Sequence, residues 1–425
     1  MKLAVVVQRY AADIGGGAEL HARYIAERLS KHAEVEVLTT CARDYVTWKN
    51  ELAAGDDTVN GIRVRRFPVA QPRDVDRFGE LSQLVFDRTH SVADELRWLS
   101  SEGPTSPSLI RYITKSEASY DAFLFFSCRY YHAWHGIRAV PRKAVVVPTA
   151  ERDPAIGLSI FGPVLRGARA VMYNSLEERA LIQHLTGRQG PGVVVGVGSE
   201  IPDRAEAMRF RRRHHVRRPF ALYVGRIDAN KGCAELFTYF QRYAARHPNG
   251  LDLVLIGTKV LDVPVHPRIR HLGFLPDQDK FDALAAADLL VMPSRYESLS
   301  MVTLEAWAMG RPVLVNGACD VLRGQCLRSG AGLYYTTFEE FAAGLYQLEA
   351  SGPVAAVFGR RGREFFRRHY AWPVIERKYL DMLDRLAREP AAPIDALPGF
   401  LARRARTVRP AAQVVAAAPA GPVLS

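Results

Sequence analysis

Short apolar runs of strand length alternate with longer amphipathic runs of helix length through most of this chain. The first residues show the pattern: KLAVVVQRY is followed by AELHARYIAERLSKH and then by AEVEVLTTC. Such alternation is typical of βαβ units with a parallel sheet, whose two faces are covered by helices. The pattern therefore predicts an α/β protein and excludes all-helical and all-strand folds.

The alternation occurs twice, on either side of the basic stretch RFRRRHHVRR at 209–218. Because 425 residues exceed the usual size of one domain, we predict two Rossmann-like domains, 1–198 and 199–369, facing a central cleft. An amphipathic helix over 370–389 follows, and a disordered basic tail rich in Pro and Ala over 390–425. Strands are predicted at 3–8, 35–40, 62–67, 121–127, 144–148, 170–174 and 193–197, and within 219–226, 251–258, 269–274, 287–294 and 311–317.

Charge and cysteine usage narrow the class of partner. Lys and Arg number 57 against 45 Asp and Glu, a balance of +12 that favours anionic partners such as nucleotides, phosphorylated lipids or nucleic acid. The five cysteines are scattered and never form a CxxC pair, which argues against disulfides and zinc. With no leader peptide and no apolar run of membrane-spanning length, we expect a cytoplasmic protein. A peripheral contact with the inner face of an anionic membrane stays open.

The stretch YVGRIDANKG places two cations in the loop after a predicted strand. The strand ends at Gly225, where a ligand can approach the backbone, and Arg226 and Lys231 follow before the next helix. Two cations above a strand end suit a diphosphate, because arginine grips oxygens in a planar fork and lysine adds a compact charge. Two ordinary surface cations are the alternative interpretation.

The stretch ESLSMVTLEAWAMGRP contains a helix whose N-terminus is polar. Ser298 or Ser300 can cap it, and Gly310 and Pro312 mark its end, so a helix is predicted over 299–309. Free N–H groups at its start, from Leu299 onward, form a phosphate site. Glu305 shares its stripe with apolar residues, and a carboxylate buried there needs a partner. We assign Glu305 to a ribose hydroxyl and Glu297 to a sugar, a layout that suits a nucleotide sugar.

These two segments resemble the motifs of a known enzyme family. Glu297 to Glu305 resembles the E-x7-E motif, and GRIDANKG the GR-x4-KG motif, of retaining glycosyltransferases of family four with the GT-B fold. The resemblance implies that Arg226, Lys231 and Glu297 are catalytic, with the cations neutralising the diphosphate and Glu297 contacting the transferred sugar. It implies a donor site at Gly225, Ser298, Leu299, Ser300 and Glu305. The loop DIGGGAE, with Gly15, Gly16 and Gly17, would approach the donor from the first domain, and the final helix would cross back to it.

The chain departs from the family pattern in three places. Ser298 and Ser300 stand where many relatives have glycines, and only Gly257 stands where a glycine pair is common. The histidine that many relatives carry after the fifth N-terminal strand is missing, and Thr149, Glu151 and Asp153 lie in that segment, VVVPTAERDP. Which of them takes the role of the histidine is left open.

Aromatic residues after two strands of the first domain are candidates for an acceptor site. SCRYYHAWHG carries Tyr130, Tyr131 and His132, and CARDYVTW carries Tyr45 and Trp48. Aromatic faces stack on sugars and histidine bonds hydroxyls, although ordinary packing explains the same residues equally well. Glu151 completes the candidate acceptor set.

The function that follows from the resemblance is retaining transfer of a sugar from a nucleoside diphosphate sugar, UDP or GDP, to an acceptor hydroxyl. We expect no cofactor and no metal, because no cluster of ligating residues has metal spacing. A role in cell-surface glycan or glycolipid synthesis is expected, with a glycan, lipid-linked or small-molecule acceptor. A sugar phosphorylase and a non-catalytic nucleotide-sugar-binding protein are the alternatives. A nucleic-acid-binding role rests on arginine clusters alone and is not expected.

Overall fold

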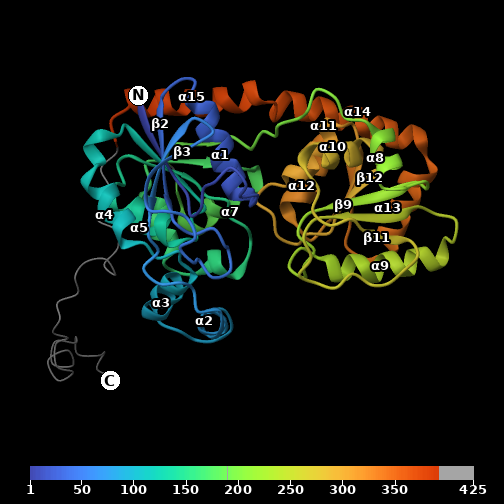
Figure 1. Ribbon diagram of the computed structural model, residues 1–425, viewed down its shortest axis with the longest axis horizontal. Helices are drawn as coiled ribbons and strands as arrows, with labels where there is room; N and C mark the ends of the chain where they lie inside the picture. Colours follow the sequence, from blue (N-terminus) through green and yellow to red (C-terminus); the bar gives the residue numbers. More distant parts are fainter. Residues whose placement is uncertain (189, 392–425) are drawn as a thin grey trace, which may run out of the picture.

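A computed structural model describes residues 1–188 and 190–391 of the chain. These residues form two β-sheets, each covered by helices, that lie side by side (Figure 1). Figure 1 places the first sheet in the blue to green part of the chain and the second in the yellow to orange part. The predicted disorder of the tail concerns residues that, from 392 onward, lie outside the described ranges.

The first sheet has the strand order β3-β4-β2-β1-β5-β6-β7-β8 and is parallel except for β3, which pairs antiparallel with β4. Its strands are β1 Lys2–Val6, β2 Glu34–Thr40, β3 Gly55–Val59, β4 Ile62–Phe67, β5 Ala122–Phe126, β6 Ala144–Val147, β7 Ala170–Tyr173 and β8 Gly192–Val194. The sequence pattern missed β3 because GDDTV is exposed at four of its five positions. This edge strand is held by backbone pairing and by ion pairs of Asp56 and Asp57 with arginines of β4, so it shows no alternation of apolar residues in the sequence.

Helices flank the first sheet in chain order. They are α1 Gly17–Leu29, α2 Val75–Asp87, α3 Val92–Glu102, α4 Pro107–Lys115, α5 Tyr131–Ala139, α6 Phe161–Gly167 and α7 Leu176–Thr186. Capping explains several starts: Ser91 and Asp94 form a reciprocal capping box at α3, and Ser175 accepts from the Glu178 N–H at α7. Strand β5 is buried at every position, as a central strand between two helix layers must be.

The second sheet has the order β11-β10-β9-β12-β13-β14, and all its pairings are parallel. Its strands are β9 Phe220–Val224, β10 Asp252–Ile256, β11 Ile269–His271, β12 Leu289–Met292, β13 Val313–Asn316 and β14 Gly332–Tyr335. The helices are α8 Ala207–Arg213, α9 Cys233–Arg246, α10 Asp277–Ala286, α11 Met301–Ala308, α12 Asp320–Ser329, α13 Phe338–Ala350, α14 Gly352–His369 and α15 Trp372–Arg388. The partly exposed edge strand β14 was not predicted.

Helix α15 returns to the first sheet, as the resemblance implied. Figure 1 shows α14 and α15 following one another along one side of both halves. His21 in α1 lies 3.1 Å from the hydroxyl of Tyr379, with both side chains buried, and Arg28 pairs with Glu376 at 3.1 Å. Two parallel α/β halves joined by a returning helix confirm the predicted GT-B fold class. The exact limits of the domains stay a prediction.

No helix within residues 1–188 and 190–391 is both long and apolar enough to cross a bilayer.

Candidate nucleotide-sugar site

The loop between β9 and α9 carries both predicted cations at the carboxyl edge of the second sheet. Gly225 follows β9, and the Tyr223 hydroxyl donates to the Arg226 carbonyl at 2.7 Å. Asp228 organises the rest of the loop, since one oxygen accepts from the Lys231 backbone N–H at 2.9 Å and the other pairs with the Arg226 guanidinium. The sequence reasoning did not single out Asp228, although its place between the two cations was visible.

Glycine is required where this loop enters α9. Gly232 has a φ of 74°, and a Cβ there would lie 2.2 Å from the Pro293 carbonyl oxygen. The backbone of the loop thereby approaches the segment that follows β12. That close approach brings Lys231 to the residues of the second motif.

Lys231 and Glu297 form an ion pair although 66 positions separate them in sequence. The Lys231 Nζ lies 2.8 Å from Glu297 Oε1, and the Glu297 side chain is only 10% exposed. Burial lowers the pKa of Lys231, but the charges of Glu297 and Glu151 outweigh burial and raise it above its ordinary value. The two motifs therefore meet at one site.

Helix α11 begins directly after the segment that carries Glu297. Ser300 is the N-cap, and its hydroxyl oxygen accepts from the Thr303 N–H at 3.3 Å, so one of the two predicted caps is confirmed. Leu299 is buried at 8% exposure and Ser298 is half-buried. The cap takes up the Thr303 N–H, and the other N–H groups at the start of the helix and the Ser298 hydroxyl can donate to an anion.

Glu305 lies in the second turn of α11 and is 2% exposed. One carboxylate oxygen, Oε1, accepts from the Ser199 hydroxyl at 2.6 Å and from the Lys280 ammonium at 3.0 Å. The other oxygen, Oε2, is buried and has no hydrogen-bond partner in residues 1–188 and 190–391. The sequence pattern indicated that a carboxylate buried here needs a partner. Neither Ser199 nor Lys280 lies in the two motifs, so the pattern did not identify them.

Glu151 extends the site from the first sheet. It follows β6 and interacts electrostatically with Lys231 and Glu297, which lie in loops of the second sheet. Burial raises the pKa of Glu151 to about 7; Lys231 opposes this rise and Glu297 adds to it. Its segment is fastened to α7, where Glu178 accepts from the Ala150 N–H at 2.6 Å. Of the three residues left open for the missing histidine, Glu151 is the one coupled to both motifs.

Two residues near Glu151 hold a left-handed backbone without being glycine. Ser127 after β5 has a φ of 63° and Thr149 after β6 has a φ of 47°. Their side chains are joined, since the Thr149 hydroxyl donates to the Ser127 hydroxyl at 3.0 Å. Such conformations cost on the order of 1–3 kcal/mol each and cluster at functional sites. This strain lies at the carboxyl edge of the first sheet, beside Glu151.

The glycine loop of the first half begins α1. Gly16 is the N-cap of the helix, and Gly17 is its first residue. A Cβ on Gly16 would lie 2.2 Å from Glu19 Oε2, and Glu19 in turn accepts from the Arg9 Nε at 2.8 Å. By contrast, Gly15 and Gly17 have open space around the position of a Cβ. The donor role of this loop stays a prediction.

The aromatic acceptor candidates are mostly packed side chains. Trp48 is 1% exposed and donates to the Glu102 carbonyl at 2.7 Å, and His132 is 0% exposed with its Nε2 2.9 Å from the Phe126 carbonyl. Tyr130 is 7% exposed and packs edge-on against Trp48. Tyr45, at 36% exposure, is accessible. Burial favours the packing alternative for Trp48, Tyr130 and His132.

Tyr131 lies at the start of α5 and is half-buried. Its ring packs on His135 with centroids 4.2 Å apart. It therefore stays an acceptor candidate together with Tyr45 and Glu151.

Ion pairs at both ends of α12 join it to the first half. Arg152, next to Glu151, pairs with Asp320 of α12 at 3.2 Å. Arg328 at the other end of α12 forms a bidentate pair with Glu177 of α7. Helix α12 is thus the element of the second half that contacts the first half beside Glu151.

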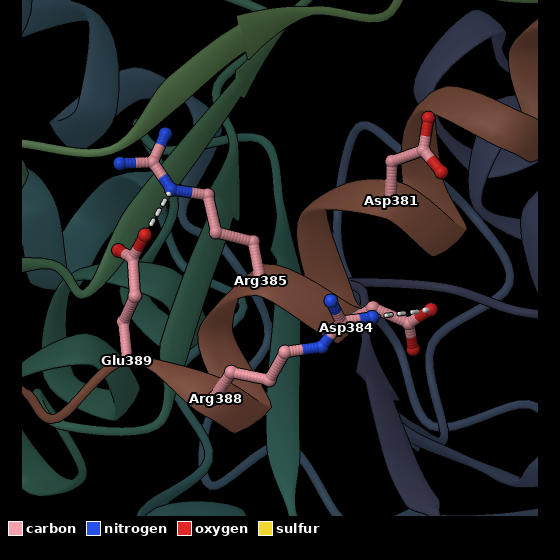
Figure 2. A pocket seen from close by; sticks show the side chains of 5 residues that line it. All are labelled: Asp381, Asp384, Arg385, Arg388 and Glu389. Carbon is pink, nitrogen blue, oxygen red and sulfur yellow. Dashed lines mark hydrogen bonds and ion pairs between the residues drawn. The ribbon is translucent and has the colours of Figure 1, made fainter.

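A hollow in the surface lies apart from the motifs. Figure 2 shows a hollow lined only by charged residues of α15 and its end, none of them predicted for the site: Asp381, Asp384, Arg385, Arg388 and Glu389. Across residues 1–188 and 190–391, no group of three or more His, Cys, Asp and Glu side chains is arranged to hold a metal ion.

The segment that holds the motifs is similar to known proteins. Residues 218–350 match the family model described as glycosyl transferases group 1. A mannosylfructose-phosphate synthase of Agrobacterium fabrum is 30% identical over 110 residues, covering 22% of this chain and 24% of that protein. An uncharacterized glycosyltransferase of Methanocaldococcus jannaschii is 23% identical over 413 residues, covering 90% of this chain and 97% of that one. For the first of these, the chain therefore spans only about a quarter of the relative's length.

Solved structures share the whole fold. HepE of Anabaena, solved in complex with UDP-glucose, superposes with a TM-score of 0.67 at 17% identity, over 91% of this chain and all of that chain (100%). Identity at this level shows the fold alone. The solved structure therefore bears on the fold, and the similarity to glycosyl transferases group 1 rests on the match at 218–350.

Proposed function

We propose that this protein is a retaining glycosyltransferase of family four that moves a sugar from a nucleoside diphosphate sugar to an acceptor hydroxyl. The observation that carries the proposal is the ion pair of Lys231 with Glu297 at 2.8 Å. It joins the two motif segments at the carboxyl edge of one sheet, where ligands of α/β proteins bind. The match of residues 218–350 to group 1 glycosyl transferases supports the same conclusion.

The donor diphosphate is proposed to bind between the N-terminus of α11 and the cations Arg226 and Lys231. A phosphate there gains backbone N–H donors and the positive end of the helix dipole. Each cation pairs with a carboxylate of the protein, Arg226 with Asp228 and Lys231 with Glu297. Binding of the diphosphate replaces part of this pairing, and Glu297 is then released toward the sugar. Ribose is assigned to Glu305, whose Oε2 has no hydrogen-bond partner in the described part of the chain.

The proposed reaction breaks the bond between the anomeric carbon and the diphosphate oxygen and forms a bond from that carbon to the acceptor oxygen. The acceptor's proton passes to the departing diphosphate. Because negative charge grows on that leaving group, Arg226 and Lys231 stabilise the transition state. No residue is assigned as a covalent nucleophile, so retention is proposed to result from attack on the face that the leaving group vacates. The mechanism uses no metal.

The base and the acceptor are proposed at a coarser level. UDP is the first choice because HepE was solved with UDP-glucose, and GDP is the second. The excess of basic residues favours an acceptor in cell-surface glycan or glycolipid synthesis, with the protein in the cytoplasm and in peripheral contact with the membrane. The similarity to a mannosylfructose-phosphate synthase keeps a small-molecule acceptor as the alternative.

A donor screen tests the proposal. The full chain is incubated with UDP-glucose, UDP-galactose, UDP-N-acetylglucosamine and GDP-mannose, and release of UDP or GDP is measured beside the thermal shift. We expect one donor to raise the melting temperature and to be consumed slowly by water without an acceptor. A protein that releases sugar 1-phosphate from a glycoside with inorganic phosphate is instead a phosphorylase. A thermal shift without turnover with any acceptor indicates a binding protein.

A further inference from the structure

We propose that Lys280 and Ser199 are positioning residues of the nucleotide site, which hold Glu305 Oε1 so that Oε2 is reserved for the ribose hydroxyls. The inference rests on the proposed function and adds to it the two residues that set the orientation of this carboxylate. Neither belongs to the two motifs.

Three separate segments meet at Glu305. Ser199 follows β8 in the connection between the sheets and donates at 2.6 Å. Lys280 lies in the first turn of α10 and donates at 3.0 Å to the same oxygen. With Glu305 at 2% and Ser199 at 4% exposure, the arrangement is enclosed, so the carboxylate cannot turn freely.

The asymmetry between the two carboxylate oxygens is what points to a ligand. The bonds from Ser199 and Lys280 both end on Oε1, while Oε2 is buried with no partner among the described residues. A buried acceptor without a donor costs about 1–3 kcal/mol. Because a carboxylate oxygen only accepts hydrogen bonds, the missing group is a donor, and the 2′ and 3′ hydroxyls of a ribose are neighbouring donors of that kind.

Lys280 also supplies the countercharge that keeps Glu305 in place. Its ammonium lies 3.2 Å from Asp277 as well, but Asp277 is largely exposed and only Glu305 is buried. Removing the cation from a buried ion pair leaves an uncompensated charge, which is strongly destabilising for that arrangement. Without Lys280 the carboxylate therefore loses the contact that orients it, and its bonds to the two hydroxyls weaken.

The experiment compares binding of a nucleotide that has the 2′ and 3′ ribose hydroxyls with binding of the same nucleotide without them. The ratio of the two affinities is the ribose preference. Dissociation constants are determined by calorimetry for UDP, GDP and their 2′,3′-dideoxy counterparts. For whichever of the two nucleotides binds the wild-type chain, we expect the dideoxy form to bind about 10- to 100-fold more weakly, the scale of a hydrogen bond to a charged group. In Lys280→Met the preference should fall to about 2-fold or less, with binding of the dideoxy form unchanged. Lys280→Arg, which keeps a cation, should restore most of the preference.

Arg209→Met is the matched control. Arg209 pairs with Asp282, a fully buried carboxylate on the same helix α10, and it has no bond to Glu305. The control loses a cation from a buried pair and should lose stability, but it should keep the ribose preference. If Lys280→Met does not fold, Ser199→Ala against Ser199→Thr gives the same comparison, and only the alanine variant should lose preference.

The outcomes separate this inference from the function on which it rests. Binding of UDP or GDP with a preference that survives both Lys280→Met and Ser199→Ala overturns the positioning role and leaves the proposed function intact. An equal loss in Arg209→Met makes the effect one of stability and also overturns it. Failure of the wild-type chain to bind either nucleotide overturns the proposed function, and the inference with it.

Discussion

The Lys231 ammonium lies 2.8 Å from Oε1 of Glu297, across 66 positions of sequence. The contact joins the loop after β9 to the segment that enters α11. In the proposed function, a diphosphate takes the place of this carboxylate as the partner of the lysine. This relationship leads to the first prediction.

Lys231→Ala and Arg226→Ala should each lower kcat by about 10² to 10³, the usual scale for loss of a group that stabilises developing charge. The measurement is donor-dependent release of UDP or GDP at saturating substrate, with circular dichroism to confirm folding. Arg246→Ala, which removes an exposed arginine from the far end of α9, is the control and should retain full activity. Near-normal turnover in both loop variants would contradict the assigned roles.

Glu305→Gln should weaken nucleotide binding about tenfold while the fold survives, because the shape is kept and a charged acceptor is replaced by a neutral one. Calorimetry with UDP and GDP measures the effect. Asp282→Asn makes the same chemical change at a buried carboxylate of α10 that accepts from Arg209 and Gln278 instead. Equal nucleotide affinity in wild type and Glu305→Gln would assign this glutamate to structure alone.

Glu151→Gln should gain stability relative to wild type as the pH rises from about 5 to about 8. Burial raises the pKa of Glu151 from an ordinary value of 4.5 to about 7, so between these values the folded state keeps a proton that the unfolded chain has released. Stability from this group is therefore present at low pH and is lost as the pH passes 7. Glutamine does not titrate and avoids the loss.

Thermal melts at pH 5, 6, 7 and 8 measure this difference in melting temperature. Glu364→Gln, at a 70% exposed side chain of α14, is the control and should show a difference that does not vary with pH. A pH-independent difference for Glu151→Gln would show that Glu151 ionises at its ordinary pH.

Gly232→Ala should destabilise the protein by about 2 kcal/mol or more, since the residue has a φ of 74° and an added Cβ would meet the Pro293 carbonyl at 2.2 Å. Gly15→Ala is the matched control, because nothing lies within 4 Å of its Cβ position, and it should change stability by less than about 0.5 kcal/mol. Urea unfolding measures both. Equal stability of the two variants would mean that the approach of this loop to Pro293 is not a constraint.

The amino-acid sequence by itself determined the fold class and the buried strands. It also named candidate residues for a donor site, and their roles stay a prediction. Strand β5 and helix α11 were predictable because apolar periodicity and capping are local properties of the sequence. Ser300, for example, directly precedes the helix that it caps. Arg226, Lys231, Glu297 and Glu305 were named from spacing within two short segments. The edge strands β3 and β14 escaped prediction because backbone pairing, which needs no apolar pattern, holds them in place.

Only the tertiary structure decided which partners these residues have. Glu305 is held by Lys280 at a separation of 25 positions and by Ser199 at a separation of 106, and no local pattern specifies such contacts. The same is true of the burial of Trp48 and His132, whose residue types suit a sugar site as well as a core. The physical reason is that side-chain partners are set by how α10, α11 and the connection after β8 pack together, which depends on the whole of both sheets.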